Sequence, residues 1–237
     1  MVKPSDPRPA YQKIAADLRA QIMDGRISGR LPSIEALKAK NDGAANATIQ
    51  NAIKVLRDEG LIASRQGQSV FVRQRAPLPI HAKAYIPKDE HTSYKVISVG
   101  DAAPPPDVAE ALGYRIPDRL PVLRKRLMLV DDEPIELSYS YHPAEIADAA
   151  RLRTLKGLIG GAAAKLAAVD LPQRTMTDLI TCRPPTTEEL EALDLPPGVS
   201  VLRTFRVIRT DGDRVVEVCV MYKGVHVAEL KYELPVD

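Results

Sequence analysis

Aromatic residues are scarce in this sequence: tryptophan is absent, and Phe and Tyr together make up 4% of the 237 residues. Proteins that bind single-stranded nucleic acids usually stack bases on aromatic side chains, so that mode of binding is not expected here. Cysteine is nearly absent as well, since only Cys182 and Cys219 occur. Two thiols without CxxC spacing exclude a disulfide framework and a cysteine zinc site, and we expect both to be reduced and packed.

Long apolar runs are also missing. No stretch reaches the length of a membrane span, and the N-terminus lacks the apolar centre of a signal peptide. The sequence therefore predicts a cytoplasmic protein that makes no membrane contact. The four histidines lack the spacing of metal ligands, and neither a Ser/His/Asp set nor a phosphate-binding glycine loop is present. No catalytic residue, metal or cofactor is expected.

The charge is unevenly distributed along the chain. The formal net charge is only +2, but residues 1–75 carry 13 Lys and Arg against 7 Asp and Glu, and the remainder carries 20 against 24. A basic first third suggests contact with a polyanion. The alternative is solvated charge that happens to be spread unevenly. The length suffices for two domains of ordinary size.

Helical patterns fill most of this basic segment. Apolar residues recur at helical spacing across Tyr11–Ile22 and again across Ile49–Leu56. Between them, Ser33 suits the N-cap of a short second helix, and Asn41-Asp42-Gly43 has the composition of a turn. The sequence thus predicts three helices, with the second and third joined by a tight turn.

A hairpin is predicted directly after the third helix. Two β-prone runs, 61–64 and 69–72, flank Arg65-Gln66-Gly67-Gln68, in which glycine can take a positive φ. Three helices followed by a hairpin form the order of a winged helix-turn-helix. In that motif the third helix enters the major groove of DNA, and the hairpin approaches the backbone or the minor groove.

The same region resembles the DNA-binding domain of GntR-type bacterial transcription regulators. The resemblance covers residues 9–73 and rests on the stretches "YQKIA", "GRLPS" and "VLRDEGLI" and on the glycine-tipped hairpin. It implies that the outer face of the third helix, the start of the second helix and the hairpin tip contact DNA. The residues that we expect to do so are Ser33, Asn46, Thr48, Gln50, Lys54, Gln66 and Gly67.

Three positions differ from the family's usual pattern. Ile34-Glu35 stands where the family has Glu-Arg, Ala45-Asn46 where it has Ser-Arg, and Gln50 where it has Arg. Arginine pairs with guanine, whereas Asn and Gln fit the N6/N7 edge of adenine. The sequence therefore predicts an operator with A·T pairs under Asn46 or Gln50. Alternatively, Asn46 caps the helix.

The other predicted contacts have alternatives too. Ser33 is a candidate phosphate contact as well as a cap, because helix starts bind phosphate. Thr48 suits a phosphate contact better than a base contact. Lys54 either contacts phosphate or is simply solvated, and Gly67 either approaches DNA or only permits the turn.

The second half of the chain predicts a different architecture. Residues 76–95 are polar, contain proline and lack periodicity, which indicates a linker. From residue 96 onward the patterns predict an antiparallel sheet with helices on one side, an α+β fold. The predicted helices cover 106–113, 154–169 and the stretch after Thr186, and the predicted strands cover 120–130, 135–143, 174–184, 200–210, 214–223 and 225–234.

Residues 95–234 resemble the UTRA domain, the effector-binding module of the HutC subfamily of GntR regulators, whose fold is similar to that of chorismate lyase. The resemblance rests on "PVLRKRLMLVDDEPIELSYSYHPAEI", "LPPGVSVLRTFRVIRTDGDRVVE" and "YKG". It implies a small-metabolite pocket and homodimerisation. Carried over to this sequence, the effector contacts are Arg126, Ser138 and Tyr222.

These pocket positions carry less charge than is usual in the family. Met128 stands where the family often has a second Arg, and Ser138 stands where it often has a carboxylate. A phosphosugar needs dense charge-assisted hydrogen bonds, so a less charged effector is expected. The alternatives are a surface role for Arg126 and core packing for Tyr222.

Together these observations predict a transcription regulator and not an enzyme. The predicted organisation is a DNA-binding domain at 1–75, a linker at 76–95 and an effector-binding and dimerisation domain at 96–237. A homodimer would bind a palindromic operator and repress transcription until a small molecule releases it. When bound to DNA it would be associated with the nucleoid. The alternatives are a constitutive repressor whose second domain only dimerises and, more remotely, a chorismate-lyase-like enzyme.

Overall fold

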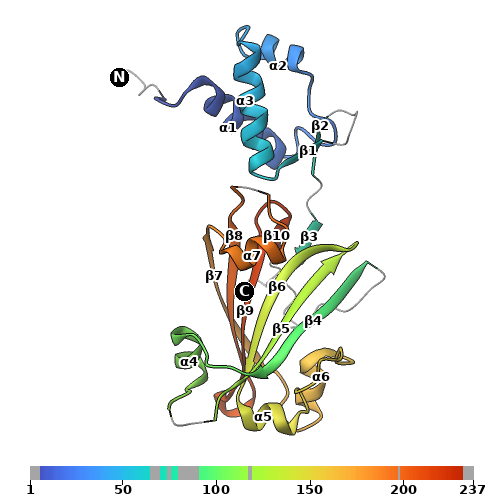
Figure 1. Ribbon diagram of the computed structural model, residues 1–237, viewed down its shortest axis with the longest axis vertical. Coiled ribbons are helices and arrows are strands. Elements are labelled where there is room, and N and C mark those ends of the chain that lie inside the picture. Colours follow the sequence, from blue (N-terminus) through green and yellow to red (C-terminus); the bar gives the residue numbers. More distant parts are fainter. Residues whose placement is uncertain are drawn as a thin grey trace, which may run out of the picture. The chain divides into compact units, whose positions relative to one another are not determined.

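The computed structural model describes residues 6–64, 70–73, 76–79, 91–116, 119–196 and 198–231. The chain divides into two compact units, one built around Met1–Ala76 and the other around Pro77–Asp194 and Ser200–Asp237. Figure 1 shows the first as a group of helices with a small hairpin and the second as a broad antiparallel sheet with short helices.

The first unit has the expected order of three helices and a hairpin. Its elements are α1 (Ala10–Met23), α2 (Ile34–Lys40), α3 (Asn46–Asp58), β1 (Ile62–Ser64) and β2 (Val70–Val72). The two strands pair antiparallel, with Ile62 opposite Val72. The predicted hairpin tip, with Gln66 and Gly67, lies outside the described residues.

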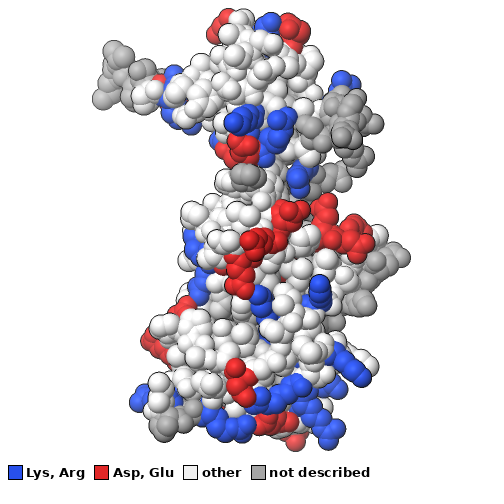
Figure 2. Space-filling view, viewed as in Figure 1, with Lys and Arg blue, Asp and Glu red and all other residues white. Residues whose placement is uncertain are grey.

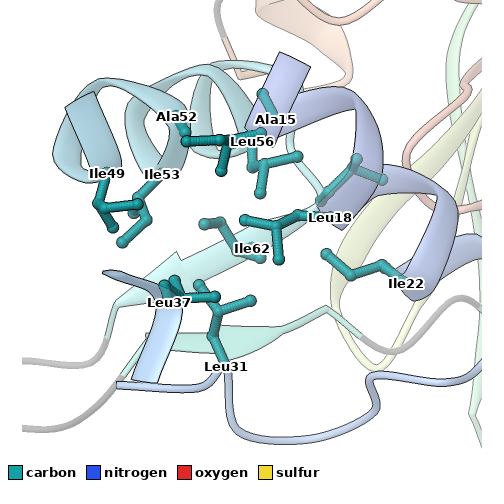
Figure 3. Packing of buried hydrophobic residues seen from close by; sticks show 12 residues of the cluster. Ala15, Leu18, Ile22, Leu31, Leu37, Ile49, Ala52, Ile53, Leu56 and Ile62 are labelled. Atoms are coloured by element: carbon teal, nitrogen blue, oxygen red, sulfur yellow. The ribbon is translucent and has the colours of Figure 1, made fainter. Parts of the chain in front are cut away.

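The core of this unit follows from the helical spacing. Leu37, Ile49, Leu56 and Ile62 are each at most 1% exposed, and they meet between α1, α2, α3 and the hairpin (Figure 3). The apolar positions of α3 recur every three or four residues, so they share one face. Burying that face leaves the polar side of α3 turned outward.

The second unit is built on one six-stranded antiparallel sheet with the order β4-β5-β6-β9-β8-β7. The strands are β4 (Thr92–Asp101), β5 (Val122–Val130), β6 (Glu133–His142), β7 (Thr175–Arg183), β8 (Val201–Arg209) and β9 (Val215–Gly224). A 3-10 turn, η1 (Asp211–Asp213), joins β8 to β9. The strand patterns thus predicted the main sheet, except for β4, which begins inside the expected linker.

Helices cover both faces of this sheet, so the expectation of helices on one side is wrong. They are α4 (Pro106–Leu112), α5 (Ala144–Ala149), α6 (Gly161–Ala167) and α7 (Thr187–Ala192). Val108 of α4 packs against Val218 and Val220 of β9. Ile146 of α5 packs in a separate cluster with Val122. Both faces of the sheet carry apolar side chains, and each face is buried by packing helices against it.

The helix expected over 154–169 begins only at Gly161. Gly160 and Gly161 both have positive φ, 72° and 71°, which an α-helix does not accommodate. Leu155 and Ile159, expected on its buried face, are 65% and 92% exposed. The glycine pair therefore confines the helix to Gly161–Ala167 and leaves residues 154–159 outside it. Helix α5 had no comparable signal in the sequence.

A separate two-stranded sheet joins β3 (Ala76–Pro79) to β10 (Ala228–Lys231). The run 225–234 was expected to close the main sheet, and this is wrong because its strand pairs with β3. Both β3 and the start of β4 lie within the predicted linker, and residues 80–90 between them lie outside the described part of the chain. The domain boundaries stay a prediction.

Candidate functional site

Helix α3 turns a polar face to solvent. Asn46, Gln50 and Lys54 are exposed and Thr48 is half-buried, whereas Ile49 on the opposite face is fully buried. Figure 2 shows basic side chains gathered over the C-terminal half of α3. A helix with this face and an apolar back has the form that enters the major groove in helix-turn-helix proteins.

Asn46 does not cap this helix. The N-cap is Ala45, which makes no side-chain cap bond, and Asn46 is the first helical residue. The capping alternative for Asn46 is therefore wrong. Its amide is exposed at the start of α3, where base contacts of recognition helices concentrate.

A groove of about 520 Å³ runs between the start of α2, the outer face of α3 and β2. It brings together Ser33, Gln50 and Lys54. Asn46 and Thr48 do not line it. Three further polar residues, Arg30, Asn51 and Arg57, line the same groove. The sequence contained a signal for the first two, because Arg30 directly precedes the Leu-Pro-Ser entry and Asn51 lies on the open side of α3.

Ser33 caps α2, as expected. Its hydroxyl oxygen accepts a hydrogen bond from the backbone N–H of Ala36 at 3.2 Å. Glu35 in the first turn and Lys40 in the last both have the sign that the helix dipole favours. The cap thus orders the helix start that lines the groove.

Two variants of Ser33 separate its capping role from DNA contact. Ser33→Ala removes the acceptor and is expected to destabilise the first unit by about 1 kcal/mol. Ser33→Asp keeps a cap acceptor, so stability should remain, but its charge should weaken DNA binding by repelling phosphate. Chemical denaturation and DNA titration measure the two effects. Unchanged DNA affinity in Ser33→Asp would remove Ser33 from the interface.

The predicted effector residues do not share one site. Arg126 lies directly opposite Ser138 on the neighbouring strand, and Ser138 lies opposite Met221. Because successive residues of a strand point to opposite faces, Tyr222 lies on the other face of the sheet. The expectation of one pocket lined by all three residues is corrected by this register.

The face that carries Arg126 is polar and largely buried. The Arg126 Nη2 donates to the Ser140 hydroxyl at 3.3 Å, and the Ser138 hydroxyl donates to the Arg126 carbonyl oxygen at 3.5 Å. The Nε of Arg126 is enclosed and has no hydrogen-bond partner. Burial lowers the pKa of Arg126, but Cys219, Glu217 and Glu136 outweigh this and raise the pKa above its ordinary value. The guanidinium therefore stays charged.

Two other cations on this face are paired with carboxylates, whereas Arg124, two residues before Arg126, donates to the backbone carbonyls of Leu152 and Thr154. Arg206 binds Asp178 at 2.7 Å, and Lys223 binds Glu136 at 2.5 Å. Met128, which stands where the family often has a second Arg, is 2% exposed. It packs with Ile135 and so contributes to the core.

Tyr222 lies in a groove of about 480 Å³ on the opposite face, beside α4 and α7. Its ring meets Tyr139 edge to face, with centroids 5.9 Å apart. The cations here are paired, Arg183 with Glu189 at 2.6 Å and Arg203 with Asp107 at 2.5 Å. Tyr222 thus packs in the core and also lines a groove. Figure 2 shows acidic side chains over neighbouring α7.

Two family models match the chain in the order of its units. The model for bacterial regulatory proteins of the gntR family matches residues 10–72, and the UTRA domain model matches residues 88–223. The chain belongs to the GntR family and carries a UTRA domain. This GntR regulator is therefore a DNA-binding transcription regulator, with a helix-turn-helix unit and a second unit of the UTRA type.

Relatives of this GntR regulator align with most of its length. An uncharacterized HTH-type transcriptional regulator of Rhizobium meliloti, RB1450, is 28% identical over 83% of this chain and 83% of its own length. A second one, SCO4628 of Streptomyces coelicolor, is 27% identical over 92% and 88%. The crystal structure of PhnF from Mycobacterium smegmatis has the same fold, with a TM-score of 0.59 at 15% identity over 94% of this chain and all of that one.

The cysteines of the regulator are both unpaired, as expected, but only one is packed. Cys219 is buried, and burial raises the pKa of its thiol to about 12. Cys182 is exposed on β7, so the expectation that it is packed is wrong. Its strand lies at the edge of the sheet, which leaves residues there less covered. None of the described helices is long and apolar enough to cross a membrane.

Proposed function

We propose that this GntR regulator is a homodimeric repressor that binds a palindromic operator and leaves it when a small molecule binds the UTRA unit. The observation that carries the DNA part is the groove that joins Ser33, Gln50 and Lys54 between α2 and α3. A symmetric dimer places two such surfaces on two half-sites.

The base contacts of the operator are assigned to Asn46 and Gln50. Both amides are exposed on α3, at positions where the family usually has arginine. Asn and Gln bond the N6/N7 edge of adenine in two places, so A·T pairs are proposed beneath them. Ser33, Thr48 and Lys54 are assigned to phosphates, which set the register of the helix without choosing the sequence.

Selection of bound sequences from a random DNA pool tests both parts. A palindrome with adenines under the recognition helix is the expected result at a stated salt concentration. A palindrome with guanines at these positions would support operator binding but contradict the adenine contacts assigned to Asn46 and Gln50. Failure to enrich any sequence, with and without cell extract metabolites, would contradict operator binding.

Replacing Lys54 with alanine is expected to weaken binding equally on all sequences. Each lost phosphate contact should flatten the dependence of log K on log salt by about 0.9, and a dimer loses two. The exposed Lys156→Ala in the UTRA unit is the matched control, and it should leave the slope unchanged. Titrations at several salt concentrations measure both. An unchanged slope in Lys54→Ala would show that Lys54 is merely solvated.

The effector is assigned to the sheet face that carries Arg126. Its charged guanidinium has an enclosed Nε without a partner, whereas Arg206 and Lys223 on that face are paired with carboxylates. A guanidinium in this state favours a ligand with one acceptor or anionic group. With Met128 in the core, the position where the family often has a second arginine carries no charge, and Arg124 on this face is bound to the backbone carbonyls of Leu152 and Thr154. The proposed effector is therefore a small, weakly charged molecule.

Release requires that the effector bind the DNA-incompetent arrangement more tightly than the competent one. A thermal-shift screen of small acids and amides, followed by operator titration with each hit, tests this. A hit that weakens operator binding and fails with Arg126→Met supports the assignment. Binding without any effect on the operator would favour the constitutive repressor, whose second unit only dimerises.

A further inference from the structure

Strand β7 forms an open edge of the main sheet. It pairs on one side with β8, from Thr175 opposite Arg209 to Arg183 opposite Val201. On its other side the part of the chain that the structure describes contributes no strand (Figure 1). Along these nine residues, the N–H and C=O groups of alternate residues point away from β8 and are unpaired, which is the template for adding another strand.

This edge lacks the features that usually prevent such pairing. Natural edges carry lysine, proline or a bulge, and β4 at the opposite edge has both Lys95 and a bulge between Val96 and Ser98. The sequence of β7, TMTDLITCR, contains neither lysine nor proline, and its pairing with β8 is regular. Its one acid, Asp178, is held by Arg206.

The centre of β7 is apolar and exposed. Leu179, the middle residue of the nine, is 61% exposed, and Thr177 and Thr181 on either side of it are exposed on the same face. An exposed leucine between β-branched residues on an unprotected edge is the pattern of a strand that pairs with a partner.

We propose that β7 pairs antiparallel with β7 of a second copy, about a two-fold axis at Leu179, so that two sheets join into one. This inference rests on the homodimer of the proposed function and assigns its dimer interface to β7. In this register Leu179 faces the partner's Leu179, and Thr177 faces the partner's Thr181. Both are favourable cross-strand pairs, and an isologous contact of this kind closes into a dimer.

The strand suits a second copy because it is self-complementary about its centre. Asp178 faces the partner's Ile180, and Arg183 faces the partner's Thr175, so no like charges meet. A shift of the register by one residue would place Asp178 beside Leu179 of the partner and lose the threonine pairs. The leucine and threonine pairs thus favour the register centred on Leu179.

Site-specific cross-linking tests this register in the full chain. In a Cys182→Ser background, Leu179→Cys places two thiols directly opposite, at about 4.5–5.5 Å between Cα atoms. That separation falls within the range of about 4.4–6.8 Å that a disulfide spans. Mild oxidation should yield a linked dimer on a non-reducing gel.

Matched single variants provide the controls. Thr177→Cys alone should not link, because four residues along a strand separate the two thiols by about 13 Å. Thr177→Cys combined with Thr181→Cys should link. Equal linking of all the single variants, or none in Leu179→Cys while the chain is a dimer, would overturn the β7 pairing.

A charge at the two-fold axis provides an independent test. Leu179→Lys should raise the dimer dissociation constant at least tenfold by sedimentation, with the folded signal checked by circular dichroism. Ile159→Lys, at a residue that is 92% exposed, should leave it unchanged. An unchanged constant in Leu179→Lys would place the dimer surface elsewhere and leave the proposed repressor intact. An unmodified chain that stays monomeric on its operator would refute both.

Discussion

Replacing Arg206 with methionine is expected to destabilise the UTRA unit by about 3–5 kcal/mol, because it leaves a buried carboxylate without its cation. The guanidinium binds Asp178 through two bonds of 2.7 Å, from Nε and Nη2. Both side chains are less than 10% exposed, so water cannot replace the lost partner. Hydrogen exchange of peptides from β7 to β9, measured in the full chain, follows this unit separately from the other.

Two further variants control for loss of the side chain itself. Arg206→Met combined with Asp178→Leu removes both charges and should recover most of the lost stability. Arg174→Met breaks a comparable pair with Asp211 that is mostly exposed, and its effect should stay below about 1 kcal/mol. If Arg206→Met and Arg174→Met behave alike, the buried pair does not hold β7 to β8.

The helix-turn-helix unit could be predicted from short-range patterns. The spacing from Ile49 to Leu56 defines the buried face of α3, and the Ser33 cap and the turn after Lys40 define the ends of α2. Each signal lies within a few residues of the structure that it specifies. For the same reason, the exposed positions Gln50 and Lys54 on α3 could be located before the structure was known.

The effector side of the UTRA unit could not be predicted in the same way. Whether Arg126 and Tyr222 share a face depends on how β5, β6 and β9 align, and a change of one residue in that register reverses the answer. The bulge between Met128 and Leu129 is one feature that shifts such alignments without a clear sequence signal. Local patterns predict where the strands lie in the sequence, but the face on which each side chain lies follows only from the pairing of the strands.

The pair of Arg206 and Asp178 illustrates the same limit. The two residues lie on neighbouring strands, 28 positions apart in the sequence, and each alone has the composition of an ordinary strand position. Gly160 and Gly161 show the converse, because a local backbone conformation shortened the helix that the apolar pattern predicted. The ion pair depends on strand pairing, which a window of ten residues does not contain.

Replacing Asn46 and Gln50 with arginine is expected to move the operator preference from adenine to guanine. Both side chains are exposed on α3 and sit where the family commonly has arginine. A good bidentate contact discriminates against the wrong base by about 1–3 kcal/mol. Each substitution should therefore change the ratio of affinities for the adenine-containing and guanine-containing operators by roughly fivefold to 150-fold. Competition between the selected operator and one with guanines at these positions measures that ratio.

The control must add the same charge without a base contact, because new arginines strengthen binding to any DNA. Ala20→Arg combined with Ala39→Arg does this at exposed positions of α1 and α2. It should raise affinity for both operators and leave their ratio unchanged. If Asn46→Arg with Gln50→Arg gives the same result as this control, then α3 does not choose bases through these positions, and the preference must arise from the shape of the DNA or from the hairpin.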